Sequence, residues 1–183
     1  KSGGQLFAKV QVVYVGLDVV ALPDVDLRAG TFTADLFVWF RYTGELDRGA
    51  LEFAGAVEPI DLGTPLWSRR RGDFTIDTHR VKATFAGDFD FHDYPFDRQA
   101  LRIDLRPRTR TTASLVLALD RLGMRTVDGG PDLRDKLASA LGSSTWELLD
   151  AVQLQDSLRS ASTLGEIGVR AADAGLVYSR VSA

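Results

Sequence analysis

Residues 87–103 read Gly-Asp-Phe-Asp-Phe-His-Asp-Tyr-Pro-Phe-Asp-Arg-Gln-Ala-Leu-Arg-Ile, a proline-centred segment that runs into an alternating one. Pro95 has no amide hydrogen and biases Tyr94 away from the helical region, so residues 93–99 are predicted to form a tight turn rich in aromatic side chains. Residues 100–106 then alternate apolar and polar side chains, which is the period of a β-strand. The side chains expected to face a core are those of Leu101, Ile103 and Leu105.

The same period recurs along the rest of the chain and predicts further strands. They are expected at residues 5–22, 31–42, 74–85, 114–119, 145–154 and 175–182, with a short edge segment at 50–59. Turn chemistry is expected at 23–30 and at 66–72, and the second of these contains three consecutive arginines, Arg69, Arg70 and Arg71.

One short helix is predicted over residues 131–141, because a proline opens the segment, leucines recur at 133, 137 and 141, and Gly142 comes directly after it. We therefore expect a single domain spanning 1–183 with an all-β fold. Its predicted architecture is an antiparallel immunoglobulin-like β-sandwich of about ten strands with one short helix.

The two faces of the strand at 31–42 differ. One row is apolar and is expected to face the core: Phe32, Ala34, Leu36, Val38, Phe40 and Tyr42. The other row is mixed and includes Phe37, Trp39 and Arg41. These three side chains either face solvent or a neighbouring subunit, or form an aromatic ladder across the sheet, and the sequence leaves both interpretations open.

Composition narrows the function. The chain has 22 basic and 25 acidic residues, so it offers no strong electrostatic case for a nucleic-acid partner. It contains no cysteine, which excludes disulfides and thiolate chemistry. No uninterrupted apolar run reaches the ~18 residues that span a bilayer, so we expect the chain as written to be soluble, as a piece of a longer protein.

An enzymatic function would depend on the two histidines, His79 and His92, and on the carboxylates of Asp88, Asp90, Asp93 and Asp97. His92 and Asp93 could act as a general-base pair, but the sequence places no nucleophile beside them. The aspartates lack the glycine and the distal glutamate of a calcium-binding helix-loop-helix. We therefore expect no enzymatic activity and no cofactor, and we assign no residue to a metal site. Whether the aspartates bind calcium stays open.

The segment Tyr-Pro-Phe-Asp-Arg-Gln at 94–99, together with the alternating strand after it, resembles the Pro-loop signature of the pentameric ligand-gated ion channels. Residues 31–42, 50–57, 74–106, 146–148 and 178–182 are similar to other segments of the extracellular domain of that family, in the same order. The absence of cysteine matches the bacterial branch, in which no disulfide closes the loop. The resemblance implies a ligand-sensing domain at the extracellular or periplasmic face of a cell membrane. It also implies a membrane part after Ala183 and a pentameric full-length protein.

The family holds its ligand between subunits, and the resemblance transfers that site residue by residue. Phe37, Trp39 and Arg41 would lie on one side, His79 on a neighbouring strand, and the other side would carry Arg106, Arg108 and Arg110. Basic residues stand where the family has aromatic ones, so a small anionic ligand is favoured over an amine. The alternative is that these arginines form a solvated rim.

The resemblance also implies that the Pro-loop passes ligand-induced movement to the membrane part. Tyr94, Pro95, Phe96 and Asp97 would then be coupling residues, with Phe96 closing the core as the alternative role. A different function is a non-channel sensor or oligomerisation module fused to another signalling or transport domain. The two functions share a fold and differ in the kind of domain expected after Ala183.

Overall fold

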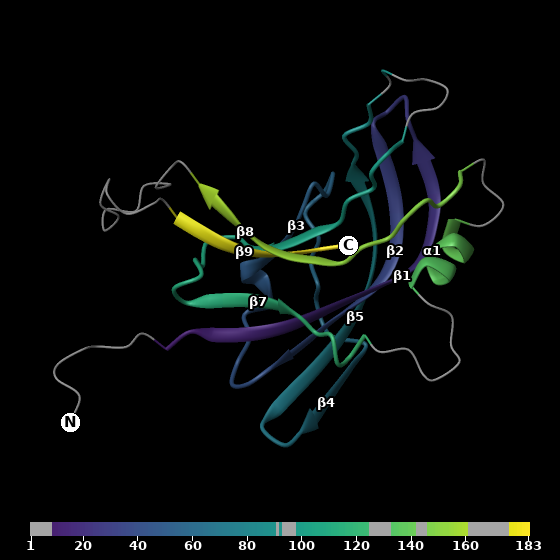
Figure 1. Ribbon diagram of the computed structural model, residues 1–183. Helices are drawn as coiled ribbons and strands as arrows, with labels where there is room; N and C mark the ends of the chain where they lie inside the picture. The colour runs from purple at the N-terminus through teal and green to yellow at the C-terminus, as the bar shows by residue number, and fades with distance from the viewer. Residues whose placement is uncertain (1–8, 91, 93–97, 125–132, 142–145, 161–175) are drawn as a thin grey trace, which may run out of the picture.

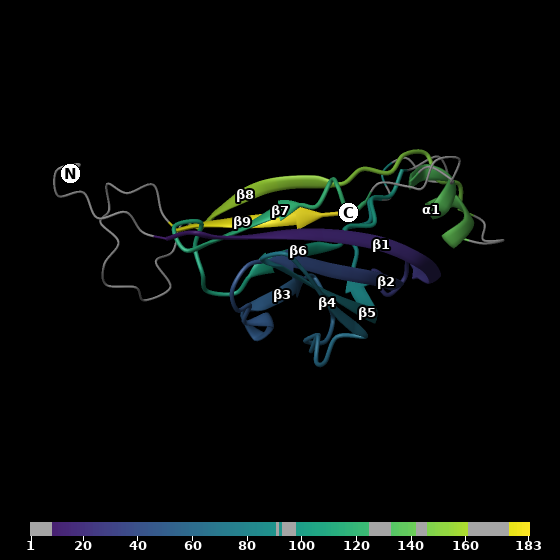
Figure 2. The same cartoon turned by 90° about the horizontal axis from the view of Figure 1, so that it is seen from below.

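The computed structural model describes residues 9–90, 92, 98–124, 133–141, 146–160 and 176–183, and these form two β-sheets with one short α-helix beside them (Figures 1 and 2). The expected all-β sandwich with a short helix is thereby confirmed. The elements in chain order are β1 (Gln11–Asp26), β2 (Thr31–Tyr42), the 3-10 helix η1 (Arg48–Ala50), β3 (Leu51–Ala54), β4 (Trp67–Arg71), β5 (Phe74–Ala86), β6 (Asp104–Pro107), β7 (Leu115–Leu119), α1 (Leu133–Leu141), β8 (Leu154–Ser160) and β9 (Leu176–Ser182).

The first sheet has the strand order β4-β5-β2-β1-β7. β2 pairs with β5 without a break, from Thr31 opposite Ala86 to Tyr42 opposite Thr75. β1 runs antiparallel to β2 but parallel to β7, so this sheet is mixed and not purely antiparallel. A parallel pair requires a long crossover connection, and here the chain visits the second sheet before it returns as β7.

The second sheet has the order β3-β6-β9-β8 and its pairs are antiparallel. β3 lies at its edge, as expected for the short segment after residue 50. β6 begins at Asp104, later than predicted, yet Ile103 and Leu105 are buried as expected and Leu101 is half-buried. Ile103 and Ala183 exchange two backbone hydrogen bonds of 2.9 and 3.0 Å, which tie the last residue of the chain to the start of β6.

The core lies between the sheets. Phe85 of β5 stacks on Phe32 of β2 with ring centroids 5.4 Å apart, and meets Phe53 of the second sheet edge-on at 6.2 Å. The predicted inner row of β2 is confirmed, since all six of its side chains are buried. Full burial of an aromatic or aliphatic side chain contributes about 1.5–3 kcal/mol, so this ring cluster is a main determinant of how the sheets face each other.

β1 continues through Pro23, where the sequence predicted a turn. The register between β1 and β2 shifts between Val19 and Ala21, and again between Ala21 and Asp24. A proline is tolerated at such an irregularity because the ladder does not need its missing amide hydrogen there. The turn comes later, at residues 27–30, and ends on Gly30, whose φ is 69°.

The three arginines predicted to lie in a turn belong to a strand instead. β4 pairs with β5 at the edge of the first sheet, and all its residues are exposed. The turn consists of Gly72 and Asp73 alone, with Gly72 at a φ of 61°. Two-residue hairpin turns require positive φ and favour glycine, so Gly72 marks the turn and the arginines charge an exposed edge.

The strand predicted at 145–154 lies later in the chain, as β8. Residues 146–153 have no regular secondary structure. Adjacent apolar residues, Leu148 with Leu149 and Ala151 with Val152, break the strict alternation of apolar and polar side chains there. The final predicted strand is confirmed as β9, and the predicted helix as α1, which lies against β1 (Figure 1).

Candidate functional site

The outer face of β2 carries a cluster around Arg41. Its guanidinium donates to both carboxylate oxygens of Asp120, at 2.7 Å to Oδ1 and 3.3 Å to Oδ2. It also lies 4.2 Å from the centroid of the Tyr14 ring and 5.2 Å from that of Phe74. Trp39 donates from its indole nitrogen to the same carboxylate at 3.1 Å. We call these five residues, Tyr14, Trp39, Arg41, Phe74 and Asp120, the Arg41 cluster.

Asp120 is the centre of this cluster and is only 2% exposed. Burial by itself would raise the pKa of Asp120, but hydrogen bonds from Arg41, Trp39 and the Gly123 amide outweigh it and hold the pKa below its ordinary value. The bond to Asp120 likewise raises the pKa of Arg41. The two charges therefore neutralise each other inside the protein, which reduces what Arg41 can offer a ligand.

The aromatic side chains of this face contact one another across the sheet. The Trp39 ring covers Gly16 of β1 so closely that a Cβ there would lie 2.0 Å from ring carbon Cζ2. Further along, Phe37 lies 6.2 Å from the Trp67 ring and 5.8 Å from the guanidinium of Arg80. Within one copy of the chain this face is an aromatic ladder, and its contact with a second copy stays a prediction.

Arg106 and Arg108 lie on the β3–β6 side of the second sheet and share one carboxylate. Arg106 donates to Glu52 at 2.7 Å. Arg108 donates to the Leu51 carbonyl at 3.3 Å and lies 3.9 Å from the second oxygen of Glu52. Both arginine side chains remain exposed, at 41% and 44%. Two cations and one anion leave a net positive charge that solvent can reach.

Arg110 comes after β6 and lies beside the start of β1, where it donates to Gln11 Oε1 at 3.0 Å and to the Ser114 carbonyl at 2.9 Å. Phe37, Trp39 and Arg41 thus lie on β2 of the first sheet and Arg106 on β6 of the second, while Arg110 contacts Gln11 of the first sheet. That the two groups form one site between copies of the chain stays a prediction.

His79, the remaining predicted ligand residue, lies in the core and is 2% exposed. Its Nδ1 is 2.8 Å from the Leu62 carbonyl oxygen, and its ring meets Phe40 edge-on at 5.9 Å. Among the described residues, its Nε2 has no hydrogen-bond partner. Burial lowers the pKa of His79 by more than the Leu62 carbonyl raises it, so the ring is neutral near pH 7. Contact with a ligand would require the core to open.

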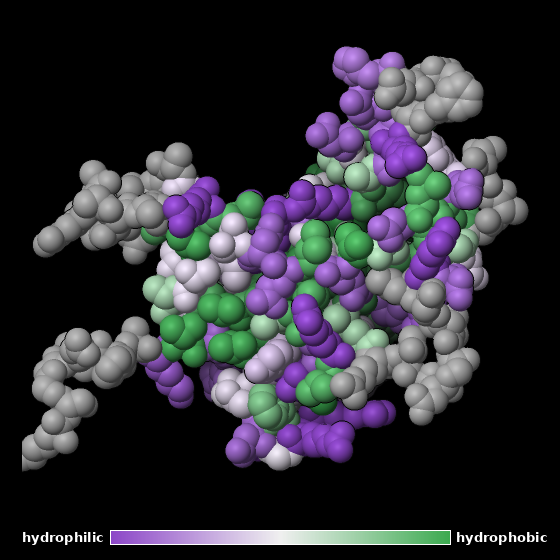
Figure 3. All heavy atoms as spheres, in the orientation of Figure 1, coloured by the Kyte–Doolittle hydropathy of each residue, from purple (hydrophilic) through white to green (hydrophobic). Residues whose placement is uncertain are grey.

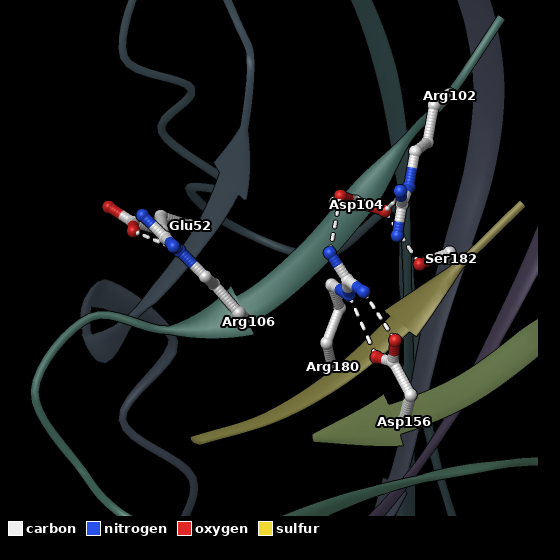
Figure 4. Close-up of polar contacts among 7 residues, drawn as sticks. All are labelled: Glu52, Arg102, Asp104, Arg106, Asp156, Arg180 and Ser182. Carbon is white, nitrogen blue, oxygen red and sulfur yellow. Dashed lines mark hydrogen bonds and ion pairs between the residues drawn. The ribbon is translucent and has the colours of Figure 1, made fainter. Parts of the chain in front are cut away.

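A polar network joins three strands of the second sheet next to the last residue of the chain (Figure 4). Asp104 accepts hydrogen bonds from Ser182 Oγ at 2.6 Å, from Arg102 Nε at 2.9 Å and from Arg180 at 3.2 Å. Arg180 also binds both oxygens of Asp156 on β8, with Nε at 2.8 Å from Oδ1. We call Arg102, Asp104, Asp156, Arg180 and Ser182 the Asp104 network.

Sequence reasoning did not find this network, or Asp120. Asp104 and Arg102 share one face of their segment by the period of two, and so do Arg180 and Ser182. That signal was readable, but which strands lie side by side was not. Asp120 is the first polar residue after an apolar strand, and it meets Arg41 from 79 positions away.

The predicted coupling residues, Tyr94, Pro95, Phe96 and Asp97, lie outside the described residues. The chain on either side of them is held together, because Gln99 accepts from the Asp90 amide at 3.0 Å and donates to the Asp90 carbonyl at 2.6 Å. Within the described ranges, no three His, Cys, Asp or Glu side chains are grouped so that they could hold a metal ion.

No protein-family model matches the sequence, and no curated protein matches it either. In the part of the chain that the structure describes, no helix combines the length and the apolar character needed to cross a membrane.

Proposed function

We propose that this chain is the ligand-sensing domain of a receptor similar to the pentameric ligand-gated ion channels, located at the extracellular or periplasmic face of a cell membrane. The observation that carries the proposal is the joint between β6 and the end of the chain. Ile103 and Ala183 exchange two backbone hydrogen bonds, and Asp104 binds both Ser182 and Arg180. The strand after the Pro-loop is thus fastened to the residues that would lead into a membrane part.

This joint supports the transmission of movement from the Pro-loop to the end of the chain, because its hydrogen bonds are direct and largely shielded from solvent. Arg180 and Asp104 are 13% and 14% exposed, and the bond to Asp156 raises the pKa of Arg180, which keeps the cation charged. The clamp between Gln99 and Asp90 closes the loop segment that precedes β6. In this proposal, movement that reaches residues 98–103 is passed through β6 to β9 and Ala183.

The ligand in this proposal is a small anion that binds between copies of the chain. Arg41 is already neutralised by Asp120, so recognition of the anion falls to Arg106 and Arg108, which share only Glu52. Charge-assisted hydrogen bonds from these guanidinium groups would hold a carboxylate. Phe37 and Trp39 of the neighbouring copy would contribute apolar contact beside it.

Calorimetric titration of the full-length protein with small carboxylates and quaternary amines tests the ligand class. Carboxylates should bind, and added salt should weaken them because the partner charges are exposed. Arg108→Ala should weaken carboxylate binding about tenfold, the equivalent of one charge-assisted hydrogen bond. Arg28→Ala is the matched control, because it removes an exposed arginine in the turn at 27–30, outside the proposed site. It should change carboxylate affinity little. Binding of amines without binding of carboxylates contradicts the proposal.

The coding sequence after Ala183 tests the receptor class. It is expected to continue into several apolar helices, each long enough to span a bilayer, and the full-length protein is expected to be a pentamer. A catalytic or receiver domain in that place would instead identify a sensor or oligomerisation module fused to another signalling domain. Functional transmission is then tested by Asp104→Ala in the full-length protein, which should keep carboxylate binding and lose the response to it.

A further inference from the structure

We infer that a cavity inside one copy of the chain binds single-chain amphiphiles by their apolar tails. The cavity has a volume of about 590 Å³ and lies among β1, α1, residues 146–154 and residues 98–103 that lead into β6. Small-molecule sites typically enclose about 300–1,000 Å³. The described residues that line it do not include Phe37, Trp39, Arg106 or Arg108, so this site is separate from the proposed site between copies and does not depend on it.

Apolar side chains make up most of the lining of the cavity, which also includes Gln99, Gln153 and Ser182. Leu22 of β1, Leu137 and Leu141 of α1, and Phe32 and Ile103 of the core all line it. None of these side chains can donate or accept a hydrogen bond, so water inside would find few partners. An apolar guest gains the full benefit of leaving water, at about 25 cal/mol per Å² of apolar surface buried.

The wall formed by residues 146–154 is unusually apolar for an exposed segment. Leu149, Val152 and Leu154 line the cavity and remain 52%, 56% and 53% exposed. Hydrophobic side chains gather beside α1 on the surface (Figure 3). Contiguous apolar surface of this kind marks binding sites, and an apolar tail that fills the cavity would cover it.

The lining of the cavity also includes charges of both signs. Arg98 and Arg102 come from the segment that leads into β6, and Glu147 and Asp150 come from residues 146–154. A head group of either sign therefore finds an opposite charge among them, and exposed pairs of this kind contribute little to affinity. The length of the apolar tail, and not the charge of the head group, sets the selectivity of this site.

Displacement of the uncharged fluorophore 1-N-phenylnaphthylamine tests this selectivity. Hexanol, octanol and decanol should displace it with affinities that rise about fourfold per methylene, which corresponds to about 0.8 kcal/mol for each. Decanoate and decylamine should match decanol within about fivefold. Affinities that do not depend on chain length, or that depend only on head-group charge, overturn the inference.

Variants locate the binding to the cavity. Leu137→Trp fills the space from α1, away from the sheets, and should weaken decanol binding about tenfold, the equivalent of roughly two methylenes. Leu122→Trp introduces the same side chain at a residue that is 66% exposed and outside the cavity, and should not weaken it. Equal decanol affinity in both variants overturns the inference.

Trp146 gives a second readout that does not depend on a filled cavity, because it also lines the site. A bromine-labelled decanol should quench part of the tryptophan fluorescence of the parent chain, and Trp146→Phe should abolish that part; unchanged quenching in the variant contradicts the site. Sedimentation with phosphatidylcholine vesicles then separates the two sources of the ligand. If the parent chain co-sediments with the vesicles and Leu137→Trp does not, the ligand is an acyl chain of the bilayer. If the parent chain does not co-sediment, the ligand is a soluble amphiphile.

Discussion

The Arg41 cluster and the Asp104 network both contain arginine and aspartate, but they differ in burial and in the number of strands that they connect. In the Arg41 cluster, one guanidinium binds one carboxylate whose side chain is 3% exposed, and aromatic rings lie against the pair. In the Asp104 network, carboxylates and arginines alternate across three strands, and the outermost carboxylate, Asp156, is 45% exposed. The Arg41 cluster is one enclosed ion pair on the first sheet. The Asp104 network is a series of bonds that reaches the edge strand of the second sheet.

This difference has an energetic consequence. A closed, desolvated pair leaves a buried charge without a partner when either member is removed, and that loss is large. In the network, removal of Asp104 leaves Arg180 bound to Asp156 and leaves Arg102 half exposed to water, so we expect a smaller effect that stays local. We therefore expect the Arg41 cluster to govern the stability of the whole domain. The Asp104 network should govern the order of the residues next to Ala183.

The largest effect is expected from Asp120→Ala. It removes the carboxylate that binds Arg41 and Trp39 and leaves the guanidinium beside the Tyr14 and Phe74 rings without its anion. Loss of one partner of a buried pair lowers the free energy of unfolding by about 3–5 kcal/mol, and because Arg41 is partly exposed we expect a loss of about 3 kcal/mol. Urea denaturation measures it.

Asp35→Ala is the matched control, because Asp35 lies on β2, the strand that also carries Arg41. Asp35 binds Arg80 with two hydrogen bonds of 2.7 and 2.9 Å, but the Arg80 side chain is 53% exposed. An exposed pair of this kind contributes at most about 1 kcal/mol. If Asp35→Ala and Asp120→Ala destabilise the domain equally, the distinction between enclosed and exposed pairs is wrong.

The next effect is expected from Gly16→Ala, which tests how rigidly the Arg41 cluster holds Trp39. The new Cβ would lie 2.0 Å from Trp39 Cζ2, and the indole cannot move without stretching its bond to Asp120. Such overpacking lowers the free energy of unfolding by about 2 kcal/mol. In Trp39→Ala the clash is absent, so Gly16→Ala should have little further effect in that background. Additive losses in the double variant would show that the ring is free to move.

The sequence predicted the fold because its alternation is local. The inner row of β2 follows from the period of two alone, and so does the burial of Ile103 and Leu105. The parallel pairing of β1 with β7 has no local signal, since it depends on the path of the chain through the second sheet. Arg69–Arg71 misled the prediction because charge indicates exposure, and an edge strand is as exposed as a turn.

The candidate site was predicted less well for a related reason. The sequence identified Trp39 and Arg41 as side chains of one face, but their anion, Asp120, is 79 or more positions away. A histidine can lie in a core or in a ligand site, and the sequence does not distinguish the two. The burial of His79 in the structure assigns it to the core. Residue type and period give the face of a strand, whereas a site depends on which faces meet.

A smaller and local effect is expected from Asp104→Ala. Arg180 keeps Asp156, so the free energy of unfolding should fall by only about 1 kcal/mol. Amide hydrogen exchange at Val181–Ala183 should become about tenfold faster, because the bond from Ser182 is lost. Glu52→Ala, at the far edge of the same sheet, should leave exchange at these amides unchanged. Uniformly faster exchange throughout the domain would show that the network acts on global stability after all.

The smallest effect is expected from His79, which contrasts with both arginine groups because it is buried without a charged partner in direct contact. Burial lowers the pKa of His79 below its ordinary value of 6.5, so the unfolded chain binds more protons than the folded one as pH falls through that value. Stability contributed by the neutral ring is therefore present above about pH 6.5 and is lost on acidification. Between pH 7 and pH 6 the loss from this residue is at most about 0.7 kcal/mol, the linkage limit for one proton with an unfolded pKa near 6.5. Urea denaturation at both pH values should show this loss in the parent chain and not in His79→Gln, and an equal loss in both would assign the pH dependence to other groups.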